Sequence, residues 1–148
     1  MINKNIEQIE KALLLGIRDY FKKNNFKKAV IGLSGGLDSS VSAFLVAKAI
    51  GPENLTALLM PETGVTTRIN YDDALKLAKK LRIKHHTITI NEPINFFSSI
   101  NDNFSNKKTK SRKDNPEKIK RSELFALANS KARIRMTILY QWAFRENA

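Results

Sequence analysis

The chain of 148 residues contains no cysteine. This absence excludes disulfide bonds, cysteine-ligated zinc and a thiolate nucleophile within it. Long apolar runs are also missing, since no stretch approaches the roughly 18 residues of a membrane span. The first residues, Met-Ile-Asn-Lys-Asn-Ile-Glu, lack the apolar core of a secretory signal peptide. The sequence therefore predicts a soluble, cytoplasmic protein with no membrane partner, and its length predicts one domain over residues 1–148.

Acidic residues are scarce relative to basic ones: 14 Asp and Glu stand against 26 Lys and Arg, giving a formal net charge of +12. The cations are concentrated in a segment of about residues 105–121, where Asp114 and Glu117 alone oppose them. Such a block is more typical of a solvated loop than of a nucleic-acid site. Aromatic residues occur only at its edges, as Phe104 and Phe125. We therefore expect a basic loop here and no nucleic-acid partner.

The most informative motif lies at residues 32–40, which read Gly-Leu-Ser-Gly-Gly-Leu-Asp-Ser-Ser. It follows the apolar run 29–31 and precedes an apolar-periodic stretch at 41–50, so the pattern predicts a strand, a glycine-rich turn and a helix. A helix N-terminus offers free backbone N–H groups and a partial positive charge to an anion. The motif is neither a Walker A loop, which ends in Lys-Ser/Thr, nor the dinucleotide fingerprint G-x-G-x-x-G. It predicts a phosphate site of another kind.

Asp38 narrows the interpretation, because a carboxylate beside a polyphosphate is repulsive unless a cation lies between them. Mg²⁺ is usually held by one or two carboxylates together with substrate phosphates. The loop thus predicts a site for pyrophosphate and Mg²⁺, and hence for ATP cleaved between its α and β phosphates. The more ordinary interpretation is a Gly-Gly turn in which Asp38 or Ser39 caps the helix.

Hydrophobic periodicity predicts a helix that ends near Asn24-Asn25, followed by strands that alternate with helices. The strands are expected at 28–33, 55–60 and 84–90, and the later helices up to about 50 and over 70–81, 93–100 and 122–145, with a possible break at 129–130. This order predicts an α/β fold with a doubly wound, Rossmann-like parallel sheet. Ligands of such sheets bind beyond the carboxyl ends of the strands. The 32–40 loop, the turn after Met60 and the segment after Ile90 belong to that rim.

Three segments resemble known families. Residues 34–39, Ser-Gly-Gly-Leu-Asp-Ser, are similar to the Ser-Gly-Gly-x-Asp-Ser signature of the PP-loop ATP pyrophosphatases, whose fold is adenine-nucleotide α-hydrolase-like. Residues 129–136, Asn-Ser-Lys-Ala-Arg-Ile-Arg-Met, resemble the Gly-Asn-x-Lys-Ala-Arg-x-Arg-Met segment of NAD synthetases. Residues 58–61, Leu-Leu-Met-Pro, resemble the Leu-Met-Pro of the same family. The order of these motifs resembles that of the ammonia-dependent NAD synthetases.

The resemblance implies a function: deamido-NAD⁺, ATP and ammonia would give NAD⁺, AMP and pyrophosphate through an acyl-adenylate. It implies that Asp38 ligates Mg²⁺, that Met60 contacts adenine and that Arg133 contacts deamido-NAD⁺. No side-chain nucleophile is needed, because such chemistry depends on positioning and charge neutralisation. The residues that would hold ATP are Gly32, Leu33, Ser34, Gly35, Gly36, Leu37, Asp38 and Ser39.

The predicted last helix carries three cations at alternate positions. Arg133 and Arg135 are two residues apart, so they point to nearly opposite sides, whereas Lys131 shares a face with Arg135. We expect Lys131 and Arg135 to be solvent-exposed or helix-pairing cations. We interpret His85-His86 as one core-facing and one exposed residue. The resembled family also implies a homodimer with a partly exposed apolar face on this helix.

In the resembled family the next segment supplies a strand with Gly-Thr and a glutamate that binds Mg²⁺. We therefore expect an incomplete sheet, the N-terminal part of a longer synthetase, with little or no activity of residues 1–148 alone. Three alternatives stay open. A tRNA-lysidine synthetase would explain the loop and the basic charge, a tRNA thiolation enzyme is disfavoured by the lack of cysteine, and a nucleotide-binding remnant would retain the loop without the chemistry.

Overall fold

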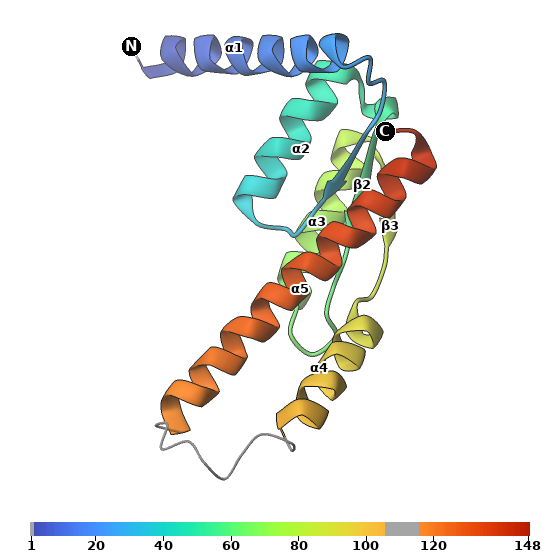
Figure 1. Cartoon of the computed structure of the whole chain (residues 1–148). Helices are drawn as coiled ribbons and strands as arrows, with labels where there is room; N and C mark the ends of the chain where they lie inside the picture. Colours follow the sequence, from blue (N-terminus) through green and yellow to red (C-terminus); the bar gives the residue numbers. More distant parts are fainter. Residues whose placement is uncertain (1, 106–115) are drawn as a thin grey trace.

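The computed structural model describes residues 2–105 and 116–148 (Figure 1). Three strands form one parallel sheet in the order β1-β2-β3, with Ala29 opposite Leu55 and Thr56 opposite Lys84. This confirms the predicted parallel α/β fold. The elements are α1 (Ile2–Lys23), β1 (Ala29–Gly32), α2 (Leu37–Ile50), η1 (Pro52–Asn54), β2 (Leu55–Leu59), α3 (Arg68–Leu81), β3 (Lys84–Thr87), α4 (Asn91–Ser105) and α5 (Pro116–Glu146).

Side chains of the central strand divide between two cores, because successive residues of a strand point to opposite faces. Leu55, Ala57 and Leu59 join the core formed with α2 and α3. Leu58 joins the second core, to which α4 contributes Ile94 and α5 contributes Ile134. In Figure 1, α3 accordingly lies behind the sheet, α2 lies to its left, and the long α5 crosses in front of it. All five residues of β2 are buried, which explains why four of them are apolar.

The expected basic loop at about 105–121 is largely wrong where the structure describes it. Helix α4 continues to Ser105 and α5 already begins at Pro116, while residues 106–115 lie outside the described part. Proline suits the first helical position because its fixed φ is helical and its missing N–H has no partner to lose there. The possible break at 129–130 is also absent, since the Ser130 hydroxyl donates to the Ala126 carbonyl within the continuous helix.

Several boundaries differ from the expected ones by a few residues. Helix α3 begins at Arg68 because the Thr67 hydroxyl accepts a hydrogen bond from the Asn70 amide at 3.3 Å. Strand β3 ends at Thr87, although the Ile88 amide still donates to the carbonyl of Leu59, the last residue of β2, and the Ile90 amide donates to the Pro61 carbonyl beyond it. The hydrogen bonding between the segments of β2 and β3 thus continues, with irregular geometry, past the carboxyl ends of the two strands.

The two adjacent histidines are both partly buried, so the expectation of one exposed histidine is wrong. The ring of His86 lies 4.9 Å from that of Trp142, because α5 covers this face of β3. His85 points to the other face and its Nδ1 lies 3.2 Å from the Ile83 carbonyl. No helix in the described parts of the chain combines the length and hydrophobicity of a transmembrane span.

Candidate phosphate-binding site

The loop between β1 and α2 is forced into its path by glycine. Gly35 has φ of 82°, a left-handed conformation that other residues adopt at a cost. A Cβ atom at Gly35 would lie 2.0 Å from the backbone oxygen of Asn70, in the first turn of α3. The Leu33 amide donates to the Leu58 carbonyl at 2.9 Å, so the start of the loop still follows the sheet. The loop is therefore fixed between β2 and α3.

The serines of the motif bond to the loop itself. The hydroxyl oxygens of Ser34 and Ser39 are 2.9 Å apart, and the Gly36 amide donates to the Ser34 hydroxyl at 3.2 Å. The hydroxyls of Ser39 and Ser40 both donate to the Gly36 carbonyl, at 3.1 and 2.7 Å. These bonds hold the turn in shape, and they use the backbone amides of Ser34 and Gly36.

The N-terminus of α2 is left without a side-chain cap. Its N-cap is Gly36, and no side chain bonds to the first turn, so the interpretation of Asp38 or Ser39 as the cap is wrong. The amides of Leu37, Asp38 and Ser39 have no acceptor within residues 2–105 and 116–148. Free amides at a helix N-terminus form a ready site for an anion.

A cavity of about 330 Å³ adjoins the loop at the carboxyl ends of β1 and β2. Gly32, Leu33 and Ser34 belong to its wall, and so does Met60, the predicted adenine contact. Most of the lining is apolar, which suits a flat, hydrophobic group such as a purine base. The remaining lining residues are Leu58, Leu59, Pro61, Thr66, Tyr71, Ala74, Arg135 and Leu139.

Asp38 lies exposed in the first turn of α2, and its carboxylate has no partner in the described residues. Within those residues no three His, Cys, Asp or Glu side chains gather as a metal site would require. The side chains of these residues alone therefore do not fit the complete coordination of a metal ion. They fit an ion held by one carboxylate and by the phosphates of a ligand, as Mg²⁺ commonly is.

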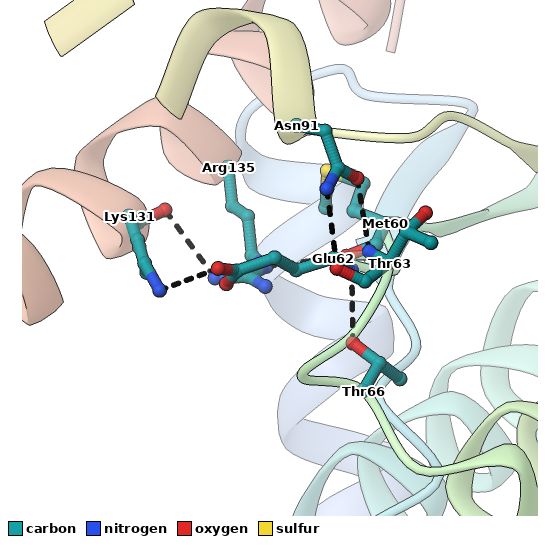
Figure 2. A network of polar contacts seen from close by, with 7 residues as sticks. All are labelled: Met60, Glu62, Thr63, Thr66, Asn91, Lys131 and Arg135. Carbon is teal, nitrogen blue, oxygen red and sulfur yellow. Dashed lines mark hydrogen bonds and ion pairs between the residues drawn. The ribbon is translucent and has the colours of Figure 1, made fainter. Parts of the chain in front are cut away.

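Two of the three cations at alternate positions 131, 133 and 135 of α5 contact the segment that follows β2, contrary to their expected exposure (Figure 2). The Lys131 ammonium lies 2.5 Å from the Glu62 carboxylate, and these side chains are only 20% and 10% exposed. Arg135 is partly buried, and its Nε donates to the Met60 carbonyl at 3.4 Å. Both cations are partly buried because this face of α5 packs on the sheet through Ile134 and Ile138.

Arg133 lies on a different side of α5, as its spacing from Arg135 predicts. Its guanidinium is exposed, and it donates to the Asn129 carbonyl of its own helix at 3.3 Å. Arg133 is not among the residues of the cavity wall. The structure thus separates the predicted substrate arginine from the cavity and brings Arg135 to it instead.

The β2–α3 segment is held from two sides. The Glu62 amide donates to the Thr66 hydroxyl at 2.9 Å, and Asn91 of α4 exchanges two hydrogen bonds with the Thr63 backbone, at 2.9 and 3.2 Å (Figure 2). Sequence reasoning identified neither Glu62 nor Asn91. The position of Asn91, directly after the third strand, was the signal, because the carboxyl ends of parallel strands share one rim.

The parallel sheet and the glycine-rich loop after its first strand define an α/β protein of the Rossmann-like class. Within that class the chain belongs to the NAD synthase family, whose model matches residues 9–148. An NH3-dependent NAD(+) synthetase of Staphylothermus marinus is 38% identical over 150 residues, which cover 99% of this chain and 48% of that protein. Another, from Archaeoglobus fulgidus, is 33% identical, over 94% of this chain and 49% of that protein.

Solved structures agree with the sequence relatives. An NH3-dependent NAD synthetase from Campylobacter jejuni superposes with a TM-score of 0.73 at 30% identity, over 96% of this chain and 53% of that one. An NMN synthetase from Francisella tularensis superposes with a TM-score of 0.74 at 29% identity, over 94% and 50% of the two chains. The chain thus spans about half the length of these relatives.

Proposed function

We propose that this chain contributes the ATP site to an ammonia-dependent NAD⁺ synthetase. The observation that carries the proposal is the uncapped N-terminus of α2 beside an apolar cavity, in a chain of the NAD synthase family. The reaction is the amidation of deamido-NAD⁺ by ammonia. ATP is consumed, and AMP and pyrophosphate are released.

The loop is suited to the pyrophosphate part of ATP. The free amides of Leu37, Asp38 and Ser39 point from a helix N-terminus, where negative charge is stabilised. Within the ATP site of residues Gly32–Ser39, Gly35 keeps the backbone close to α3. The apolar cavity beside Met60 takes the adenine, and the exposed Arg133 contacts deamido-NAD⁺ outside it.

The proposed reaction has two steps. A carboxylate oxygen of the nicotinate group bonds to the α-phosphorus of ATP, and the bond from that phosphorus to the bridging oxygen of pyrophosphate breaks. Ammonia then bonds to the acyl carbon, AMP leaves with the electron pair of the C–O bond, and the nitrogen loses a proton to solvent. Mg²⁺ held at Asp38 would neutralise phosphate charge. The loop amides stabilise the pyrophosphate that leaves.

The proposed setting is a homodimer in the cytoplasm. Its support is an exposed apolar stripe on α5, formed by Met136, Tyr140 and Phe144 at four-residue spacing.

The test measures binding and turnover separately. We expect residues 1–148 to bind ATP with Mg²⁺, and the protein that carries the whole synthetase to form AMP and NAD⁺ in equal amounts from deamido-NAD⁺, ATP and ammonium. Because the relatives are about twice as long, we expect little turnover from residues 1–148 alone. A chain that does not bind ATP contradicts the proposal. ATP binding without affinity for deamido-NAD⁺ in the complete protein indicates a remnant, and tight, salt-sensitive tRNA binding indicates a lysidine enzyme.

A further inference from the structure

Arg135 is the one charged residue among the described residues that line the cavity. Its guanidinium carries five N–H donors. The structure accounts for two contacts, both long: Nε to the Met60 carbonyl at 3.4 Å and Nη1 to the Lys131 carbonyl at 3.5 Å. No carboxylate in residues 2–105 and 116–148 pairs with it. A partly buried guanidinium with donors to spare is a strong ligand for phosphate oxygens.

The nearby acidic side chain is taken by another cation. Glu62 is buried on the same segment as Met60, and its carboxylate is paired with Lys131, one helical turn before Arg135. Figure 2 shows both cations reaching this segment from α5. A buried carboxylate without Lys131 would be a costly unpaired charge, and Arg135 would be the nearest guanidinium on that face to neutralise it. The Lys131–Glu62 pair therefore leaves Arg135 available to a ligand.

The position of Arg135 selects one phosphate of ATP. The cavity that it lines reaches from Met60 to Gly32 and Ser34, whereas the free amides of the loop begin further on, at α2. An adenosine in the cavity and a pyrophosphate at α2 place the α-phosphate between them. On this basis, which rests on the proposed ATP site, we infer that Arg135 binds the α-phosphate of the nucleotide and that the Lys131–Glu62 pair keeps it free to do so.

The experiment compares ligands that differ in one phosphate. Calorimetric titrations of residues 1–148 and of the whole protein use adenosine, AMP and pyrophosphate. The wild type is expected to bind AMP about tenfold or more tightly than adenosine, as a charge-assisted contact provides. Arg135→Gln should abolish this preference and leave the affinities for adenosine and pyrophosphate unchanged. Arg145→Gln, an exposed arginine further along α5, is the matched control and should retain the preference.

A second pair of variants tests the role of Lys131. Lys131→Met leaves the Glu62 carboxylate unpaired, so Arg135 should turn to it and the preference for AMP should fall. Adding Glu62→Gln removes that carboxylate charge and should restore the preference. Circular dichroism verifies that each variant is folded. If the Lys131→Met protein does not fold, the Arg135→Gln comparison decides whether Arg135 binds the α-phosphate.

The inference is overturned by a wild type that does not prefer AMP to adenosine, or by an Arg135→Gln protein that keeps the preference. An equal loss of adenosine and AMP affinity also contradicts it, because a structural role would act on both. A failure of the proposed function can be distinguished from a failure of this inference. If AMP is recognised through Arg135 but deamido-NAD⁺ is not amidated, the substrate is wrong and the α-phosphate contact stands.

Discussion

Replacement of Gly35 should displace the loop between β1 and α2 from its contact with α3. In Gly35→Ala the new Cβ would lie 2.0 Å from the Asn70 oxygen, in a backbone with φ of 82°. Backbone strain and the steric clash together should cost roughly 2 kcal/mol of stability or more. We expect loss of ATP and pyrophosphate affinity, because the loop must move away from α3. Titration with pyrophosphate and denaturant unfolding measure the two effects.

Gly64 provides a matched control for this substitution. It also has a positive φ, of 86°, but a Cβ there meets nothing within 4 Å. Gly64→Ala should therefore cost about 1 kcal/mol for its left-handed backbone and keep the affinity for pyrophosphate. If both variants lose affinity equally, the contact between Gly35 and α3 is not what holds the loop.

The strand, turn and helix around residues 32–40 were predicted correctly, whereas the contacts of α5 were predicted only in part. The position of the turn follows from the sequence, because glycines and a helix start are local signals. The helical spacing also placed Lys131 and Arg135 on one face. Which face meets the sheet depends on packing by Ile134 and Ile138, which are remote from the sheet in sequence. For that reason the buried pairing with Glu62 was missed.

At the scale of elements, β3 and the end of α5 are joined by one ion pair. The Lys84 ammonium lies 2.8 Å from the Glu146 carboxylate. The hydrogen bond from Lys84 lowers the pKa of Glu146 below its ordinary value, and the charges of Lys28 and His86 act in the same direction. Because the pKa is lower in the folded state, this contribution to stability is present above the unfolded pKa and is lost as the pH falls through the folded one.

Glu146→Gln should therefore be less stable than the wild type near pH 7, and the difference should vanish in acid, below the usual carboxylate range of about 4. Unfolding midpoints in urea between pH 7 and pH 3 measure it. Glu7→Gln, at an exposed position of α1, is the control and should show no such dependence. A difference that stays constant down to pH 3 would mean that the carboxylate charge is not what stabilises this end of α5.

The order of the elements was predictable, whereas their ends were less so. Period-two and period-3.6 patterns are local, and they gave all three strands and the helices between them. The ends depend on single contacts, such as the Thr67 hydroxyl that starts α3. Residues 101–105 and 116–121, which the structure places in α4 and α5, were not predicted as helix because charged and polar residues mask the periodicity. A helix needs only one apolar face, so polar residues on its other faces do not end it.

At the scale of the whole molecule, α5 packs one face on the sheet and presents another to solvent. Met136, Tyr140 and Phe144 are 49%, 71% and 91% exposed. An apolar stripe of this kind on a folded protein usually marks an interface. We expect it to join two copies in the proposed homodimer, since the helix is long and straight enough to pack against its own copy.

Tyr140→Glu places a charge in the middle of this stripe and should convert the dimer to a monomer, because an unpaired buried charge is costly. Sedimentation equilibrium at several concentrations measures the change, and an unaltered far-ultraviolet circular dichroism spectrum verifies the fold. Leu15→Glu, at an exposed position of α1, controls for added charge and should leave the dimer intact. A wild type that sediments as a monomer, or a Tyr140→Glu protein that remains dimeric, would mean that the α5 stripe does not join two copies.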